Sequence, residues 1–150
     1  SLEVDKVAEY LAHLKAAAFT DIRTDQIIIT ADTVVILEEQ ILGKPKNKTE
    51  AVKMLESLSN RSHKVMTGVC IKSKDKTVSF SNTTKVFFKE LASSEINYYI
   101  ENYKPFDKAG SYGIQEWIGA IGITKIEGSY FNVVGLPVQE LNEQLQNEYF

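Results

Sequence analysis

The spacing of hydrophobic residues predicts a chain of alternating helices and strands. From Val4 to Phe19, apolar residues recur at intervals of three and four with charged residues between them, which predicts an amphipathic helix. The dense β-branched run from Ile27 to Ile36 predicts a strand that is buried on both faces. From Thr49 to Leu58 the spacing becomes helical again, and we expect Thr49 to cap that helix.

The second half of the pattern predicts a hairpin followed by three more elements. Segments 63–71 and 77–88 are rich in β-branched and aromatic residues, and the polar segment 72–76 between them predicts a loop that joins antiparallel strands. Beyond it we expect a helix from Ser93 or Ser94 through Tyr103, a strand from Ile118 to Ile126, and a closing helix from Val138 to Leu145. The order α-β-α-β-β-α-β-α predicts an α/β fold with a mixed central sheet and flanking helices, built as one domain over residues 1–150.

Composition and charge narrow the classes of partner. The chain carries a net charge of −3 with scattered lysines, whereas a nucleic-acid or membrane-surface protein would need clustered positive potential. We therefore expect neither nucleic acid nor membrane as a partner. No apolar run reaches the roughly 18 to 20 residues of a membrane span, and the single cysteine, Cys70, lies in an apolar run as a buried, inert thiol would. These features predict a cytoplasmic protein.

Asp32 is the most informative single residue for chemistry. It lies between two apolar runs, where an ionised carboxylate needs a partner if it is buried. In open α/β sheets ligands collect beyond the carboxyl ends of strands, and a carboxylate there is well placed to hold a metal or polarise a water. The alternative is an aspartate that turns a strand into its loop and accepts local backbone N–H bonds. The residue pattern alone leaves both interpretations open.

Two predicted loops carry candidate phosphate ligands. Lys44 lies between a glycine and a proline, but without a Walker A pattern, so by itself the tripeptide is typical of a surface turn. The segment from Asp107 to Gln115 gathers two glycines, a charge pair, two hydroxyls and an amide. Lys108 is suited there to a phosphate, and Gln115 offers both a donor and an acceptor to a base edge. A capped, solvated turn is the alternative for this segment.

Five short segments, taken in order, resemble the Maf family. They are Ala31-Asp32-Thr33-Val34-Val35, Leu42-Gly43-Lys44-Pro45, Thr67-Gly68-Val69, residues 107–115 and residues 128–137. Each segment is short, but their joint presence in this order and at family-like separations makes the resemblance specific, and it covers the whole chain. It implies an inosine-triphosphatase-like α/β fold. It also implies hydrolysis of the bond between the α- and β-phosphates of a nucleoside triphosphate, with magnesium or manganese as the divalent cation.

The resemblance also suggests roles for individual residues. The family's acidic residue falls on Asp32, which would accept the proton of the attacking water or bind the metal. Family lysines fall on Lys15 and Lys44, and together with Lys108 they would neutralise phosphate charge. Thr33 and Gln115 match positions that select the base, and their identities are those of the branch that acts on dTTP and UTP.

Two departures from the family pattern add further expectations. Family members open with a strand and a Ser-x-Ser-Pro-Arg-Arg loop that residues 1–150 do not contain, so we expect this stretch alone to be impaired and to leave a neighbouring strand unpaired. Glu116 and Trp117 follow Gln115 where glycine is common, which is expected to reshape the rim of the base pocket. The resemblance also leads us to expect a homodimer.

Two alternative functions stay open at this point. The first is a non-catalytic nucleotide-binding protein that acts in septum formation during cell division, a role associated with the family name. The second is a pyrophosphatase for another, modified nucleotide. The two are separated from the leading hypothesis by diphosphate release from a panel of nucleotides.

Overall fold

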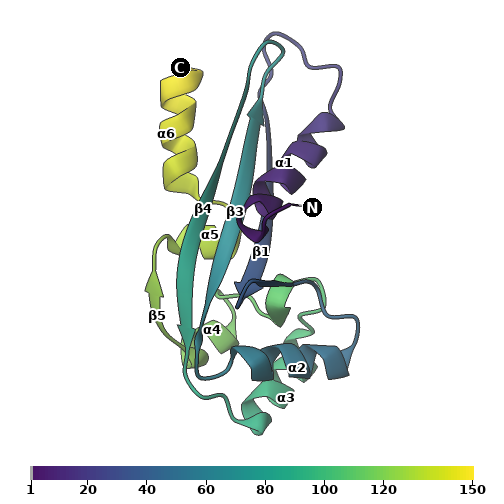
Figure 1. Cartoon of the computed structure of the whole chain (residues 1–150), viewed down its shortest axis with the longest axis vertical. Coiled ribbons are helices and arrows are strands. Elements are labelled where there is room, and N and C mark those ends of the chain that lie inside the picture. Colours follow the sequence, from purple (N-terminus) through teal and green to yellow (C-terminus); the bar gives the residue numbers. More distant parts are fainter. Residues whose placement is uncertain (1) are drawn as a thin grey trace.

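The computed structural model describes residues 2–150 as a five-stranded sheet with helices around it (Figure 1). The strand order is β2-β1-β3-β4-β5, and all four pairings are antiparallel. The strands are β1 (Ile28–Leu37), β2 (Gln40–Leu42), β3 (Ser62–Lys72), β4 (Thr77–Phe88) and β5 (Ile123–Glu127). The helices are η1 (Val4–Lys6), α1 (Val7–Ala17), α2 (Lys48–Leu58), α3 (Ser93–Tyr103), η2 (Ala109–Ser111), α4 (Trp117–Gly122), α5 (Tyr130–Val134) and α6 (Val138–Glu148).

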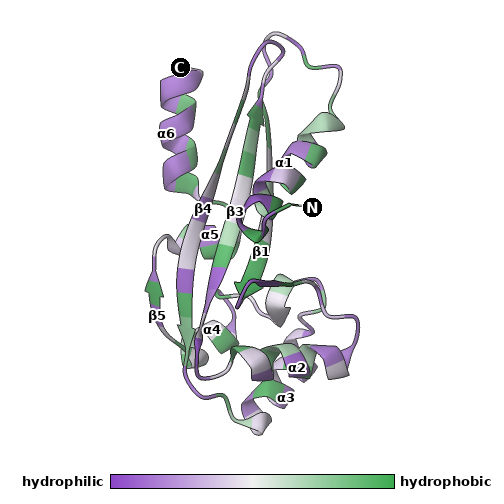
Figure 2. Ribbon diagram, in the orientation of Figure 1, coloured by the Kyte–Doolittle hydropathy of each residue, from purple (hydrophilic) through white to green (hydrophobic). Residues whose placement is uncertain are grey.

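The helices form three groups around the sheet. Helix α1 covers one face of the long strands, α5 and α6 cover the other, and α2, α3 and α4 gather at the lower end (Figure 1). Because side chains alternate along a strand, β3 can bury Met66 against α1 and Val69 against α6, and much of β3 between its hydrophilic ends is hydrophobic (Figure 2). The α/β class with flanking helices is therefore confirmed.

The sheet is antiparallel where we expected a mixture of directions. That expectation rested on helices in the connections, which usually return the chain to the starting end of a sheet. Here α3 and α4 stay at the lower end, so β5 begins beside the end of β4 and runs back along it (Figure 1). A helical connection that does not cross a sheet face produces an antiparallel neighbour.

Helix α1 packs on the sheet partly through the apolar row that the sequence indicates, since Val4, Val7 and Leu11 contact a buried cluster, but its most deeply buried residues are others. We expected the larger apolar residues to face the sheet, but Leu14 is half exposed, and the fully buried residues are Ala8, Ala12 and Ala16. The reason lies in β3, where a Cβ added to Gly68 would come within 2.3 Å of the α1 backbone. Only small side chains fit where the helix lies that close to a strand.

Strand β1 is buried less completely than its composition predicts. Its second half, from Val34 to Leu37, is buried, whereas residues 28–33 are at most partly buried. The short strand β2, which the sequence pattern did not reveal, pairs with β1 only over Val35–Leu37. Within the described residues, the edge of β1 from Ile28 to Val34 has no neighbouring strand.

Several predicted boundaries shift by local chemistry. The hairpin of β3 and β4 and the closing helix are confirmed. The predicted strand 118–126 is instead divided into helix α4 and strand β5. Ile118 and Gly122 are both buried and lie four residues apart, as on one face of a helix. Helix α2 is capped by Asn47, whose side chain accepts from the N–H of Glu50 at 2.9 Å, and not by Thr49. At the start of α3 the Glu95 carboxylate accepts from the backbone of Ala92, so neither serine is the cap.

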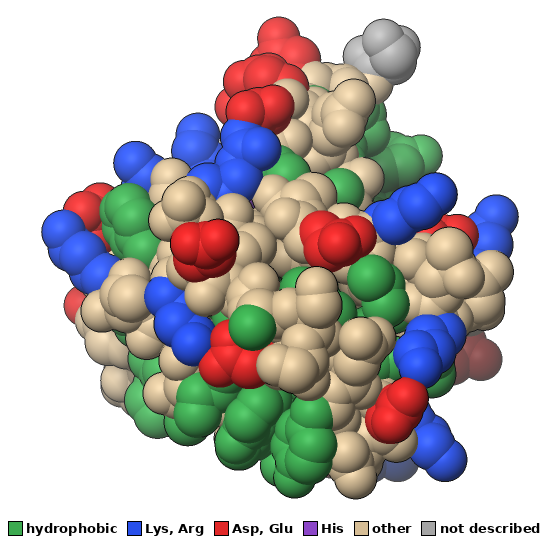
Figure 3. All heavy atoms as spheres, turned by 90° about the horizontal axis from the view of Figure 1, so that it is seen from below, with side chains coloured by type: hydrophobic (Ala, Val, Ile, Leu, Met, Phe, Trp, Pro, Cys, Tyr) green, Lys and Arg blue, Asp and Glu red, His purple; other side chains and the backbone are tan. Residues whose placement is uncertain are grey.

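Two surface properties follow from the same structure. No helix among residues 2–150 has the length and hydrophobicity to cross a bilayer. The lower end of the molecule shows lysine or arginine side chains interspersed with acidic ones, and not a patch of one sign (Figure 3).

Candidate functional site

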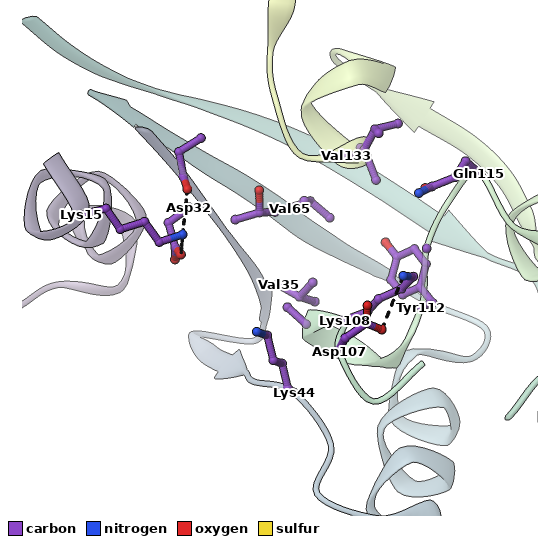
Figure 4. A pocket seen from close by; sticks show the side chains of 15 residues that line it. Lys15, Asp32, Val35, Lys44, Val65, Asp107, Lys108, Tyr112, Gln115 and Val133 are labelled. Carbon is purple, nitrogen blue, oxygen red and sulfur yellow. Dashed lines mark hydrogen bonds and ion pairs between the residues drawn. The ribbon is translucent and has the colours of Figure 1, made fainter. Parts of the chain in front are cut away.

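A pocket of about 280 Å³ lies at the open edge of β1, above the point where β2 pairs with that strand. Its walls come from α1, β1, the loop after β2, the loop between α3 and α4, and α5 (Figure 4). The structure brings all six predicted site residues into this one pocket: Lys15, Asp32, Thr33, Lys44, Lys108 and Gln115. Four separate segments of the chain therefore supply one cluster of cations, a carboxylate, a hydroxyl and an amide.

Asp32 and Lys15 form an ion pair at one end of the pocket. Lys15 Nζ lies 2.8 Å from Asp32 Oδ1 and donates to the carbonyl oxygen of Ala31 at 2.9 Å. Asp32 does not leave the strand as we expected, because β1 continues through it and pairs it with Gly68. Its side chain is 23% exposed and lines the pocket. The turn interpretation of Asp32 is therefore wrong.

Thr33 faces the opposite side of β1 from Asp32, as alternation along a strand requires. Its hydroxyl lies 2.8 Å from the Thr67 hydroxyl, which in turn donates to the carbonyl of Asn132 at 3.2 Å. Both Asp32 and Thr33 nevertheless line the pocket. A ligand there can contact Asp32 and Thr33 although they are neighbours in sequence with opposite orientations.

Lys44 and Lys108 come from two loops that are tied together. The N–H of Gly110 donates to the carbonyl of Gly43 at 3.1 Å, so the loop after β2 lies against the loop after α3. Lys44 is exposed and makes no ion pair with any residue from 2 to 150. The Lys108 amino group is 3.5 Å from the Asp107 carboxylate. Both lysines are placed to attract an anion.

Gln115 lies at the other end of the pocket from the Asp32–Lys15 pair (Figure 4). It is exposed, whereas residues 110–114 before it are buried. Gly110 adopts a positive φ of 71° and lies against the Val35 side chain, where a Cβ would come within 3.0 Å. This glycine lets the loop pack against β1, so the segment is an anchored wall of the pocket, although Asp107 within it is solvated as in the alternative interpretation.

The pocket also contains residues that the sequence pattern did not single out. Tyr112 is buried, and its hydroxyl lies 2.6 Å from Nε2 of buried His63. Burial lowers the pKa of His63 to about 4 and raises that of Tyr112, so the pair is neutral at neutral pH. Val133 and Val134 line another wall, and they belong to helix α5, which the sequence pattern did not reveal. A possible signal for α5 was Ser129, whose side chain caps it.

The residues present set a limit on metal binding. Residues 2–150 contain no cluster of three or more histidine, cysteine or acidic side chains suited to a metal. Two carboxylates, Asp32 and Asp107, line the pocket. Mg²⁺ usually binds through one or two carboxylates, waters and substrate phosphates instead of a protein cage. The donor set fits a cation that arrives with a phosphate ligand.

Comparison with known proteins agrees with this geometry. The family described as "Maf-like protein" matches residues 1–148. A dTTP/UTP pyrophosphatase of Christiangramia forsetii is 52% identical over 146 residues, which cover 97% of this chain and 74% of the relative. A dTTP/UTP pyrophosphatase of Flavobacterium psychrophilum is 51% identical over 151 residues, covering 100% of this chain and 77% of the relative. One from Porphyromonas gingivalis is 50% identical over 149 residues, covering 97% and 75%.

Proposed function

This chain belongs to the Maf family, and on that premise we propose that it is a nucleoside triphosphate pyrophosphatase that converts dTTP and UTP to the monophosphate and diphosphate. The observation that carries the proposal is that one pocket brings together Asp32, three lysines and the Gln115 amide. The names of the similar proteins support the choice of pyrimidine substrate.

The two ends of the pocket suit the two ends of a nucleotide. Lys15, Lys44 and Lys108 supply positive charge for the triphosphate, which a chain with a net charge of −3 must concentrate locally. At the opposite end Gln115 offers an amide N–H and a carbonyl, which complement the carbonyl and N–H edge of uracil or thymine. Thr33 would add a hydroxyl contact that discriminates among bases.

In the proposed reaction a water oxygen bonds to a phosphorus atom of the α–β anhydride, and the bridging P–O bond breaks. Lys15 holds Oδ1 of Asp32 at 2.8 Å, and the second carboxylate oxygen accepts the proton of the water. The lysines stabilise the charge that develops on the phosphate oxygens. Asp32 is the residue that would hold a divalent cation, magnesium or manganese, and such a cation would acidify the water so that a carboxylate is an adequate base.

The test is diphosphate release from dTTP, UTP, CTP, GTP and 7-methyl-GTP with magnesium or manganese. It compares the 150-residue chain with the same chain extended by the family's opening strand and Ser-x-Ser-Pro-Arg-Arg loop. We expect release from dTTP and UTP, and its loss in Asp32→Asn. Asp75→Asn, in the hairpin turn outside the pocket, is the matched control and should keep full activity. Tight nucleotide binding without turnover in both chains would leave only the non-catalytic binding role.

A further inference from the structure

The turn that presents Gln115 to the pocket is held by one buried phenol. Tyr99 on α3 has an exposed fraction of 0%. Its hydroxyl donates to Oε1 of Glu116 at 2.5 Å and accepts from the backbone N–H of Gly113 at 3.1 Å. The Tyr99 side chain of α3 is therefore hydrogen-bonded on both sides of Gln115, to Gly113 before it and to Glu116 after it.

The backbone around Gln115 has little other freedom. The N–H of Glu116 donates to the carbonyl of Gly113 at 3.0 Å, which closes the turn. Ile114 is buried, and a Cβ on Gly119 would come within 1.9 Å of its carbonyl oxygen, so the following helix α4 packs directly on the turn. The backbone position of Gln115, from which its amide extends, is consequently set by these contacts and by the Tyr99 hydroxyl.

The Tyr99 hydroxyl remains a hydrogen-bond donor to Glu116 over the neutral pH range. Burial, and next the hydrogen bond to Glu116, raise the pKa of Tyr99 well above its ordinary value, so the hydroxyl stays protonated and remains a donor. The Glu116 carboxylate is thereby turned to Tyr99, and it does not line the pocket that holds Asp32. A charge next to the base end is directed into a buried hydrogen bond.

We propose that Tyr99 is a positioning residue for Gln115 and that its bonds to Glu116 and Gly113 set the base selectivity of the pocket. The proposal rests on the proposed function, because it takes Gln115 as the residue that reads the base. An amide pairs with a base edge only within narrow limits of distance and angle. Asp32, Lys15 and Lys44 are carried by other elements, so loss of these bonds should weaken base reading more than chemistry.

The test variant is Tyr99→Phe, which keeps the buried ring and removes only the hydroxyl. We expect the preference for UTP over CTP, measured as the ratio of their kcat/KM values, to fall by about tenfold, mainly through a higher KM for UTP. The ratio also cancels any shift of Lys108, whose side chain packs against Gly113 and acts on every nucleotide. Glu116→Ala should reproduce the loss, and Glu116→Gln, which keeps an acceptor, should retain most of the preference.

The matched control is Tyr103→Phe. Tyr103 stacks on Tyr99 with ring centroids 5.1 Å apart, and among residues 2–150 its hydroxyl forms no hydrogen bond to the turn. Its removal should leave the UTP preference unchanged. An equal effect of Tyr103→Phe and Tyr99→Phe, or an unchanged UTP preference in a folded Tyr99→Phe variant, would overturn the proposal.

A binding measurement separates this proposal from the catalytic one. Trp117, the single tryptophan, follows Glu116 at the start of α4, and its ring centroid lies 4.8 Å from that of Tyr98. Its fluorescence therefore reports on the turn. Titration with UTP and CTP gives dissociation constants without turnover. A wild-type protein that binds UTP selectively but releases no diphosphate refutes catalysis, and loss of that selectivity in Tyr99→Phe still supports the positioning role. A wild-type protein that binds neither nucleotide refutes both proposals.

Discussion

Gly68 lies so close to Ala8 that a Cβ on the glycine would stand 2.3 Å from the carbonyl carbon of the alanine. The nearest atoms belong to the backbone of α1, so an added Cβ could not be accommodated by the movement of a side chain. Gly68 is also the partner of Asp32 across β1 and β3. The approach of α1 to the sheet is thus fixed beside Asp32, and α1 carries Lys15 to that carboxylate.

Gly68→Ala should force α1 away from the sheet and separate Lys15 from Asp32. Overpacking of this kind costs about 1 to 3 kcal/mol of unfolding free energy, and diphosphate release should fall with it. Urea unfolding and the nucleotide assay check both effects. Gly43→Ala is the control, because nothing lies within 4 Å of its added Cβ and the unfolding free energy should hardly change. Equal unfolding free energies for the two variants would contradict the argument.

Lys15→Met should separate function from stability. The Lys15 side chain is 55% exposed, so loss of its pair with Asp32 should change the unfolding free energy by less than about 1 kcal/mol. If the ammonium stabilises phosphate charge, kcat/KM for UTP should fall by roughly 100-fold or more. Steady-state kinetics beside thermal unfolding measure the two quantities. Lys53→Met, on an exposed position of α2 outside the pocket, should leave both unchanged.

The sequence predicts the membership of the site better than its architecture. Asp32, Lys15 and Lys44 were identified by resemblance, and they meet in one pocket because α1, β1 and the loop after β2 converge there. What the hydrophobic pattern did not reveal was the strand β2, whose three residues pair only with the end of β1. Hydrophobic spacing reports burial but not which edge of a strand lacks a neighbour.

The misassigned elements have a common physical cause. In α1 the large apolar residues suggested the buried stripe, but the close approach at Gly68 reserved that face for alanines. In segment 117–122, the alternation of isoleucine with glycine and alanine fits a short helix as well as a strand, and packing decides between them. Tertiary contacts therefore override local pattern where backbones lie close together.

Stability should fall as the pH drops from 7 to 5 because of His63. Burial lowers its pKa from 6.5 to about 4, so the unfolded chain binds the proton first, which stabilises the unfolded state relative to the native state. The full native stability is present above pH 6.5 and is lost progressively as the pH approaches 4. At pH 5 the unfolding free energy should be about 2 kcal/mol below its value at pH 7.

Urea unfolding at pH 7, 6 and 5 checks this dependence. His63→Gln removes the titrating group and keeps a polar atom for the Tyr112 hydroxyl, so its unfolding free energy should vary much less over this range. The variant is expected to be less stable than the wild type at pH 7 and closer to it at pH 5. A wild-type profile as flat as that of His63→Gln would show that His63 is not the titrating group.

Gln115→Glu should change which base the pocket accepts. The glutamine amide offers a donor and an acceptor, whereas a carboxylate only accepts. The variant therefore cannot donate to a carbonyl of uracil or thymine, and its negative charge faces the carbonyl oxygens of the base. We expect kcat/KM for UTP and dTTP to fall by about 10- to 100-fold, with a smaller loss for CTP, whose amino group is a donor. Gln146→Glu on the exposed side of α6 makes the same charge change outside the pocket and should leave all three substrates unaffected. An equal loss for UTP and CTP in Gln115→Glu would mean that the residue acts through the net charge of the pocket and does not read the base.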